Sequence, residues 1–137
     1  MIGFDSSALL AYVRDEPGAD LVGDLLDDAD VEMFVHAANL CEMFHSLLRF
    51  EGRTIAEESL RDFLSLGVQV RGDMDEAFWR DAAELITRQR LAGVGLPLGD
   101  ALGVALARRL DAEFVTSDRG EIEPLERAGL CRVIFIR

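Results

Sequence analysis

The chain has 137 residues, half of them hydrophobic, which suits one domain with an ordinary buried core. No apolar run approaches the roughly 18 residues needed to span a membrane. The N-terminal segment MIGFDSSALLAYVRDE lacks the basic start of a signal peptide, so we expect a cytoplasmic protein that does not contact membranes. The two cysteines, Cys41 and Cys131, are predicted to be buried and reduced rather than joined in a disulfide.

The charge of the chain is strongly one-sided. The formal net charge is −12, with 26 acids against 14 bases, and every base is an arginine. The absence of lysine excludes Schiff-base chemistry, a phosphate-loop lysine and a lysine general base. An acidic protein binds nucleic acid poorly by itself, because that binding requires neutralisation of phosphate charge. Action on nucleic acid would therefore need bound cations and a local rim of arginines.

Predicted strands and helices alternate along the whole chain. Short runs rich in β-branched or aromatic residues indicate strands, and apolar residues spaced three and four apart indicate helices. This alternation is typical of a parallel sheet with helices packed on it, so we predict a single α/β domain over residues 1–137. The predicted strands are 1–4, 31–35, 68–70, 113–116 and 130–136, and helices are predicted in the segments between them.

Several predicted helix starts carry residues that favour capping. Thr54 and Glu57 have the spacing of a capping box, and either Asp73 or Asp75 can cap the long helix that follows the third strand. Pro97 opens the next helix, which is apolar almost all the way round. We therefore predict that this helix is central and buried.

Four acids stand out by their positions. Asp5 and Asp118 directly follow apolar strands, and Asp100 lies in the first turn of the helix that leads into the strand before Asp118. Each of these three also suits a helix cap or complements a helix dipole, so none indicates a site by itself. Glu42 lies inside the predicted helix after the second strand, where no capping role applies. Taken alone it is an exposed acid beside Arg49.

The arrangement of the four acids is more informative than any one of them. The carboxyl ends of parallel strands meet at one edge of a sheet, where α/β proteins bind ligands, so Asp5, Glu42, Asp100 and Asp118 are expected to converge there. Carboxylates in one cleft repel each other unless a cation neutralises them. Mg²⁺ is a hard cation that takes carboxylates, waters and phosphate oxygens. The two histidines have no cysteine or histidine cluster around them, so a zinc site is not indicated.

Such a cleft supports hydrolysis of phosphodiester bonds. One or two metal ions can generate hydroxide, orient it for in-line attack and stabilise the leaving oxygen. A carboxylate that the metal does not fully occupy can take a proton from the attacking water. The acids therefore predict a metal-dependent nuclease.

Three segments and the total length resemble PIN-domain ribonucleases, most closely the VapC toxins of bacterial toxin–antitoxin pairs. The segments are FDSSALLAYV, VHAANLCEMFHSLLR and LPLGDALGVALARRLDAEFVTSDRGE. The resemblance implies a PIN-like three-layer α/β/α sandwich with a mostly parallel central sheet of four to five strands. It also implies that Asp5, Glu42, Asp100 and Asp118 are the catalytic and metal-binding acids, and that Thr116 supplies an accessory hydroxyl.

The same resemblance implies an activity and partners. The implied activity is endonucleolytic cleavage of RNA with Mg²⁺ or Mn²⁺. The implied partners are a second copy of the chain, in a homodimer, and a cognate antitoxin. The C-terminal segment of that antitoxin would cover the cleft and place an arginine among the carboxylates. Gly99 departs from the alanine that often precedes the aspartate, and Leu98 replaces a small polar residue, but neither change removes a ligand. The arginines considered for a rim that contacts RNA are Arg14, Arg49, Arg53 and Arg119.

Other functions are weighed against this hypothesis. A phosphatase of the haloacid-dehalogenase type would use Asp5 as its nucleophile, but it needs a second aspartate where Ser7 stands and a lysine that the chain lacks. A receiver-type signalling domain also needs a lysine. A PIN-like interaction module without a toxin role would be expected to have lost part of the acidic quartet, whereas all four acids are present. The sequence identifies neither the RNA nor the number of metal ions.

Overall fold

The computed structural model of the protein describes residues 1–137, with a five-stranded sheet through its centre. The strand order is β3-β2-β1-β4-β5, and all four neighbouring pairs are parallel. The predicted α/β class and the predicted sheet of four to five strands are confirmed, and the sheet is parallel throughout. The strands are β1 (Ile2–Phe4), β2 (Met33–His36), β3 (Gln69–Arg71), β4 (Glu113–Thr116) and β5 (Arg132–Phe135).

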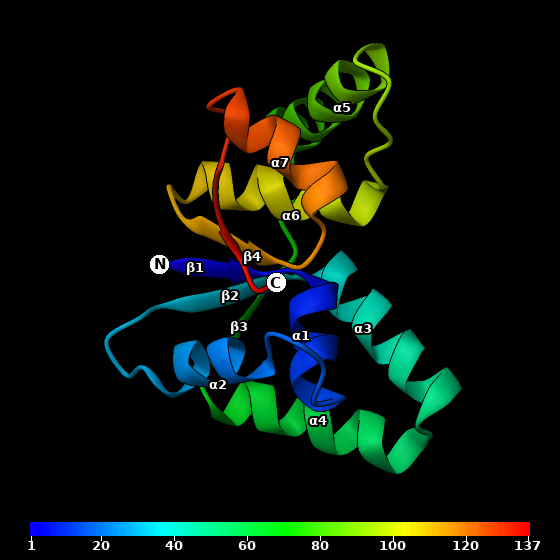
Figure 1. Ribbon diagram of the computed structural model, residues 1–137, viewed down its shortest axis with the longest axis vertical. Helices are drawn as coiled ribbons and strands as arrows, with labels where there is room; N and C mark the ends of the chain where they lie inside the picture. Colours follow the sequence, from blue (N-terminus) through cyan, green and yellow to red (C-terminus); the bar gives the residue numbers. More distant parts are fainter.

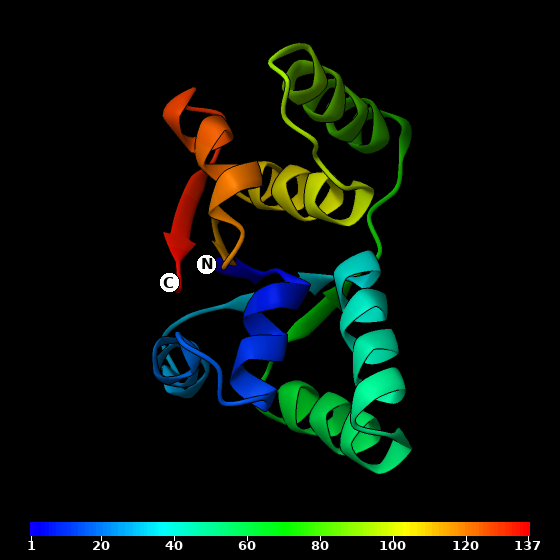
Figure 2. The ribbon, with the colours of Figure 1, turned by 45° about the vertical axis from the view of Figure 1, so that its right-hand side comes forward.

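Seven helices cover the two faces of the sheet (Figure 1). Figure 2 shows the first four below the sheet and the last three above it, which gives three layers. None of them combines the length and the apolar character that crossing a membrane requires. The helices are α1 (Ser6–Val13), α2 (Ala19–Asp27), α3 (Ala37–Phe50), α4 (Arg53–Ser65), α5 (Glu76–Leu91), α6 (Leu98–Arg109) and α7 (Arg119–Arg127).

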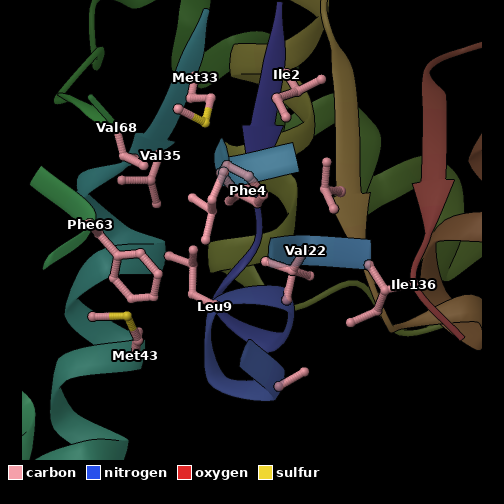
Figure 3. Packing of buried hydrophobic residues seen from close by; sticks show 14 of the residues in the cluster. Ile2, Phe4, Leu9, Val22, Met33, Val35, Met43, Phe63, Val68 and Ile136 are labelled. Carbon is pink, nitrogen blue, oxygen red and sulfur yellow. The ribbon is translucent and has the colours of Figure 1, made fainter. Parts of the chain in front are cut away.

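Each side of the sheet has its own hydrophobic core. Val35 and Phe4 point into the core between the sheet and helices α1 to α4 (Figure 3). Val115 belongs to the same core. Phe34 and Phe114, one position earlier in their strands, belong to the core beneath α5 to α7. This alternation follows from the two-residue period of a strand. Strands that are buried on both faces are apolar at nearly every position, as β1 and β2 are.

The connections place a crevice between β1 and β4. The chain passes from β1 to β2 and β3, and then returns through α5 and α6 to β4 on the other side of β1. Strands whose connections diverge in this way leave a crevice at their carboxyl ends, where α/β proteins bind ligands. Phe4 is in register with Val115, and the next residue, Asp5, donates its N–H to the Val115 carbonyl at 2.9 Å. The acid after β1 therefore lies beside the end of β4.

The predicted capping box at the start of α4 is wrong. The helix begins two residues earlier than that motif requires, at Arg53, and Gly52 occupies the N-cap with a φ of 93°. Thr54 lies inside α4, and no side chain caps the start of this helix. Gly52 takes this position because its left-handed conformation suits glycine, and it lets the chain turn sharply between α3 and α4.

The other local predictions need small corrections. β2 starts two residues later than predicted and ends at His36, whose Nδ1 caps α3 by accepting the N–H of Ala38 at 3.1 Å. Asp75, rather than Asp73, caps α5. Element ends commonly shift by one or two residues without a change in the fold.

The two cysteines are free, but only one is shielded. Cys41 is exposed, so its predicted burial is wrong: the buried positions of α3 are Asn39, Met43 and Leu47, and residue 41 faces away from them. Cys131 is half-buried, and burial raises the pKa of its thiol to about 11.

The contact between α6 and β4 leaves no room for a side chain at Gly103. A Cβ there would lie 2.7 Å from the Phe114 ring and 2.9 Å from Asn39 Oδ1. We expect Gly103→Ala to lower the free energy of unfolding by about 1–2 kcal/mol, because overpacking outweighs the gain in helix propensity. Gly120→Ala in α7 is the matched control, since nothing lies within 4 Å of its Cβ position. Urea unfolding measures both, and equal midpoints for the two variants would contradict the packing argument.

Candidate functional site

Asp5 is the most enclosed acid of the protein, with none of its surface exposed. Its carboxylate accepts hydrogen bonds from Ser7 Oγ at 2.6 Å and from Thr116 Oγ1 at 2.8 Å. Longer bonds of 3.3 Å come from Ser6 Oγ and Asn39 Nδ2. Asp5 stands at the N-cap position of α1, but its side chain makes no capping hydrogen bond. It is therefore held by hydroxyl and amide donors rather than serving as a cap.

Two hydroxyl groups connect Asp5 to the turn after β4. Thr116 donates to Asp5 Oδ2 and accepts the N–H of Asp118 at 3.0 Å. Ser7 donates to the same oxygen and accepts the N–H of Ser117, also at 3.0 Å. Because each hydroxyl acts both as donor and as acceptor, the ends of β1 and β4 are held in one fixed arrangement.

Asp100 and Asp118 complete a cluster with Asp5. One carboxylate oxygen from each residue lies within 4.8 Å of those of the other two. Asp100 is in the first turn of α6 and only 5% exposed, and Asp118 is half-buried at the N-cap position of α7, where its side chain makes no capping bond. The structure thus brings together the two acids that directly follow strands and the acid that starts α6.

Glu42 lies at the open rim of this cluster. Its Oε2 accepts a hydrogen bond of 3.2 Å from Ser6, which also donates to Asp5. Partial burial and the charge of Asp5 raise the pKa of Glu42, and the Ser6 hydrogen bond opposes that rise. A Cβ at Gly99 would come within 2.8 Å of the Glu42 carboxyl carbon. The glycine that replaces a common alanine in α6 therefore makes space for this carboxylate.

Asn39 is a site residue that sequence reasoning missed. It is fully buried in α3, and its Nδ2 donates to Asp5 at 3.3 Å and to the Gly99 carbonyl at 3.2 Å. Its Oδ1 has no hydrogen-bond partner. An unpaired buried acceptor costs about 1–3 kcal/mol, so the amide is better explained by positioning than by stability. The sequence signal for Asn39 was its position four residues before Met43, which places a polar side chain on the apolar face of α3.

Glu121 is a second missed residue. It is half-buried in the first turn of α7, three residues after Asp118 and therefore on the same side of the helix. A side-chain hydrogen bond and the negative charge of Glu121 both raise the pKa of Asp100, and its charge also raises that of Asp118. The spacing of three after Asp118 was the signal in the sequence.

No arginine forms an ion pair with the acids of the site. Eleven ion pairs join arginines to acids in this protein, and none of them includes an acid of the cluster. Burial is the largest cause that raises the pKa of Asp100 and of Asp118, and the charge of Asp5 is the next. Protonation or a bound cation would relieve this repulsion.

The donor set fits a hard divalent cation. Carboxylate oxygens make up the whole cluster, and no cysteine or histidine belongs to it. Mg²⁺, Mn²⁺ and Ca²⁺ prefer such oxygen ligands, whereas zinc favours histidine and cysteine. Oxygens that share an ion at roughly 2.0–2.6 Å each lie up to about 5 Å apart, so a separation below 4.8 Å is compatible with one shared ion.

The four arginines predicted as a rim come from the ends of four different helices. Arg119 follows Asp118 directly and donates to the Arg137 carbonyl at 2.7 Å. Arg14 and Arg49 lie near the last turns of α1 and α3, where both contact the ring of Phe50. Arg53, at the start of α4, pairs with an acid one turn further along.

The sequence model of the PIN domain family matches residues 2–126. The chain belongs to the PIN domain family. PIN domains are nucleases and generally use divalent metals, which agrees with an oxygen-only cluster at a sheet edge. Among curated proteins, none matches the chain.

Solved structures of similar fold include toxins and their complexes. VapBC2 from Rickettsia felis, bound to a DNA fragment from its promoter, has a TM-score of 0.75 and 16% identity over 98% of both chains. VapC20 from Mycobacterium tuberculosis, a Sarcin-Ricin loop cleaving toxin, has a TM-score of 0.73 and 17% identity over 90% of this chain and 95% of that one. A toxin–antitoxin complex from Klebsiella pneumoniae has a TM-score of 0.72 and 15% identity over 100% and 98%. At these identities the likeness shows a shared fold.

The raised pKa of Asp100 predicts that the metal-free PIN domain loses stability as the pH rises. Above an unfolded-state pKa near ~4, the folded protein binds more protons than the unfolded chain, so its free energy of unfolding falls toward neutral pH. Asp100→Asn removes one charge from the cluster. We expect it to raise the free energy of unfolding in EDTA at neutral pH by at least about 1 kcal/mol and to flatten the pH dependence.

Urea unfolding at mildly acidic and neutral pH measures both effects. Asp24→Asn is the matched control, because Asp24 is exposed on α2 and forms no ion pair. It should leave the stability and its pH dependence unchanged. If Asp100→Asn were less stable than the wild type in EDTA at neutral pH, repulsion among the acids would not be the dominant effect.

Proposed function

We propose that this PIN domain is a metal-dependent endoribonuclease and the toxin of a toxin–antitoxin pair. One observation carries the proposal: three buried or half-buried aspartates share a small space without an arginine partner. Asp5, Asp100 and Asp118 would hold Mg²⁺ or Mn²⁺, with Glu42 at the rim. The bound cation supplies charge neutralisation, activation of water and stabilisation of the leaving oxygen.

The residues of the cluster differ in what they contribute. Asp5 is a pre-oriented ligand, because the Thr116 hydroxyl and its other donors fix its carboxylate. Asp100 and Asp118, whose pKa values are raised, would release their protons when a cation binds. Glu42 lies at the rim with a raised pKa, so it is placed to accept a proton from water that approaches the scissile phosphate.

RNA is the proposed substrate. One protein of similar fold is a toxin that cleaves the Sarcin-Ricin loop, and the resemblance of the sequence to VapC toxins points the same way. Since the net charge is −12, RNA binding would rely on the cation and on local arginines. The proposed rim consists of Arg14, Arg49 and Arg119.

An antitoxin is the proposed protein partner. Toxin–antitoxin complexes with similar folds support this, and the chain would act as a homodimer as VapC-like proteins are expected to do. An antitoxin arginine placed among the carboxylates would supply the cation that the cluster lacks within its own chain. The antitoxin arginine and the metal ion would then compete for the same carboxylates.

The two alternative functions have less support in the geometry. A phosphatase of the haloacid-dehalogenase type needs a second carboxylate two residues after its nucleophile, but Ser7 stands there and donates a hydrogen bond to Asp5, and the chain has no lysine. An interaction module without activity has no use for a cluster of mutually repelling buried acids. Such a cluster is typical of a functional site.

Substitution of Asp100 tests the proposed activity. We expect Asp100→Ala to lower Mg²⁺-dependent cleavage of purified cellular RNA by at least about 100-fold, because a ligand is lost while the fold is kept. It should also relieve growth inhibition on expression. Asp24→Ala, on the exposed face of α2, is the matched control and should cleave like the wild type. Cleavage by Asp100→Ala at the wild-type rate would contradict the metal site.

A further inference from the structure

An exposed aromatic residue with two arginines against it lies at the end of α3. Phe50 is the last residue of that helix and is 67% exposed. The guanidinium of Arg49 lies 4.8 Å from its ring centroid, and that of Arg14 lies 5.8 Å away. Both distances fall within the range of a cation–π interaction. The core does not account for this ring, because most of its surface faces solvent.

Helix α3 connects this group to the acidic cluster. Arg49 comes seven residues after Glu42, which places it two turns away, roughly 10 Å, on the same face of the helix. Ser46 lies between them and accepts a hydrogen bond of 2.8 Å from Arg14. One surface therefore runs along α3 from Glu42, past Ser46 and Arg14, to Arg49 and Phe50.

The two arginines are held differently. Arg14 donates twice to Glu51, at 2.8 and 3.2 Å, which fixes its guanidinium beside the ring of Phe50. Arg49 has no carboxylate partner, although the chain has nearly twice as many acids as bases. Its charge is therefore available to a ligand. The other arginines without an ion pair are Arg61, Arg88 and Arg90.

We propose that Phe50 and Arg49 form a stacking site for an unpaired base of the RNA substrate, with Arg14 as its rigid support. We call these three residues the α3 platform. The proposal rests on the proposed ribonuclease function and deepens it. Any nucleobase can stack on an aromatic ring or a guanidinium plane, and the charge of Arg49 suits the adjoining phosphate. A base inside a duplex is already stacked, so the α3 platform would select single-stranded loops or ends.

Binding of short RNA to platform variants tests this assignment. The probes are fluorescein-labelled 12-nucleotide oligo(A) and oligo(U) RNA, and Asp100 is kept in all proteins, with Ca²⁺ in place of Mg²⁺ so that the acids hold a cation without cleavage. Fluorescence anisotropy should show that Phe50→Ala weakens binding about 5- to 150-fold without changing its salt dependence. Phe50→Trp should retain binding, because it keeps an aromatic face.

The salt dependence separates the arginine from the ring. Arg49→Ala should reduce the slope of log affinity against log salt concentration by about 0.7, the value for one phosphate contact on a single strand. Arg88→Ala is the matched control, since Arg88 is exposed and without an ion pair on α5, in the opposite helical layer. It should change neither the affinity nor the slope.

Several outcomes would overturn the α3 platform. One is RNA affinity that is equal in Phe50→Ala and its parent, and another is a parent that binds neither oligonucleotide. A third is a change from dimer to monomer in Phe50→Ala with unchanged RNA affinity, which would assign the surface to a protein contact. With Mg²⁺ in place of Ca²⁺, unchanged metal-dependent RNA cleavage by Phe50→Ala would leave the ribonuclease function standing while the platform fails.

Discussion

Repulsion between Asp5, Asp100 and Asp118 is the constraint on which the rest of the site depends. Three carboxylates lie close together at the edge of the sheet, two of them almost wholly shielded from solvent, and no arginine pairs with any of them. The folded chain tolerates this through protonation, through hydrogen bonds to Asp5 and through the dipole at the start of α6. A cation resolves the repulsion more completely. Stability given up in this way is typical of functional sites.

The fold supplies the supports that keep these acids in place. The crevice between β1 and β4 sets Asp5 beside Thr116, whose hydroxyl also fixes the turn that carries Asp118. From the other side, Asn39 ties Asp5 to the start of α6. Gly99 leaves the space that Glu42 occupies. Hydrogen-bonded supports of this kind commonly matter as much to metal affinity as the ligands themselves.

The convergence of the aspartates could be predicted from sequence because Asp5 and Asp118 directly follow strands and Asp100 starts the helix that leads into β4. A parallel sheet brings such ends together. Asn39 could not, because its contacts depend on how α3 is rotated against α6. Periodicity alone identifies it as a core position. The capping box at Thr54 failed for a local reason, since Gly52 occupies the N-cap instead. Phe50 follows the buried Leu47 by three residues, a spacing that predicts a core position, but it is the last residue of α3 and is exposed.

Titration of Mn²⁺ into the metal-free protein, followed by calorimetry at mildly acidic pH in two buffers of different ionisation enthalpy, tests the central claim most directly. Ligands with raised pKa values must lose protons to bind a cation, so the account predicts binding coupled to proton release. It also predicts that Asp100→Asn greatly reduces both. The account would be contradicted if Mn²⁺ did not bind. It would also be contradicted if Mn²⁺ bound without proton release and Asp100→Asn left this binding unchanged.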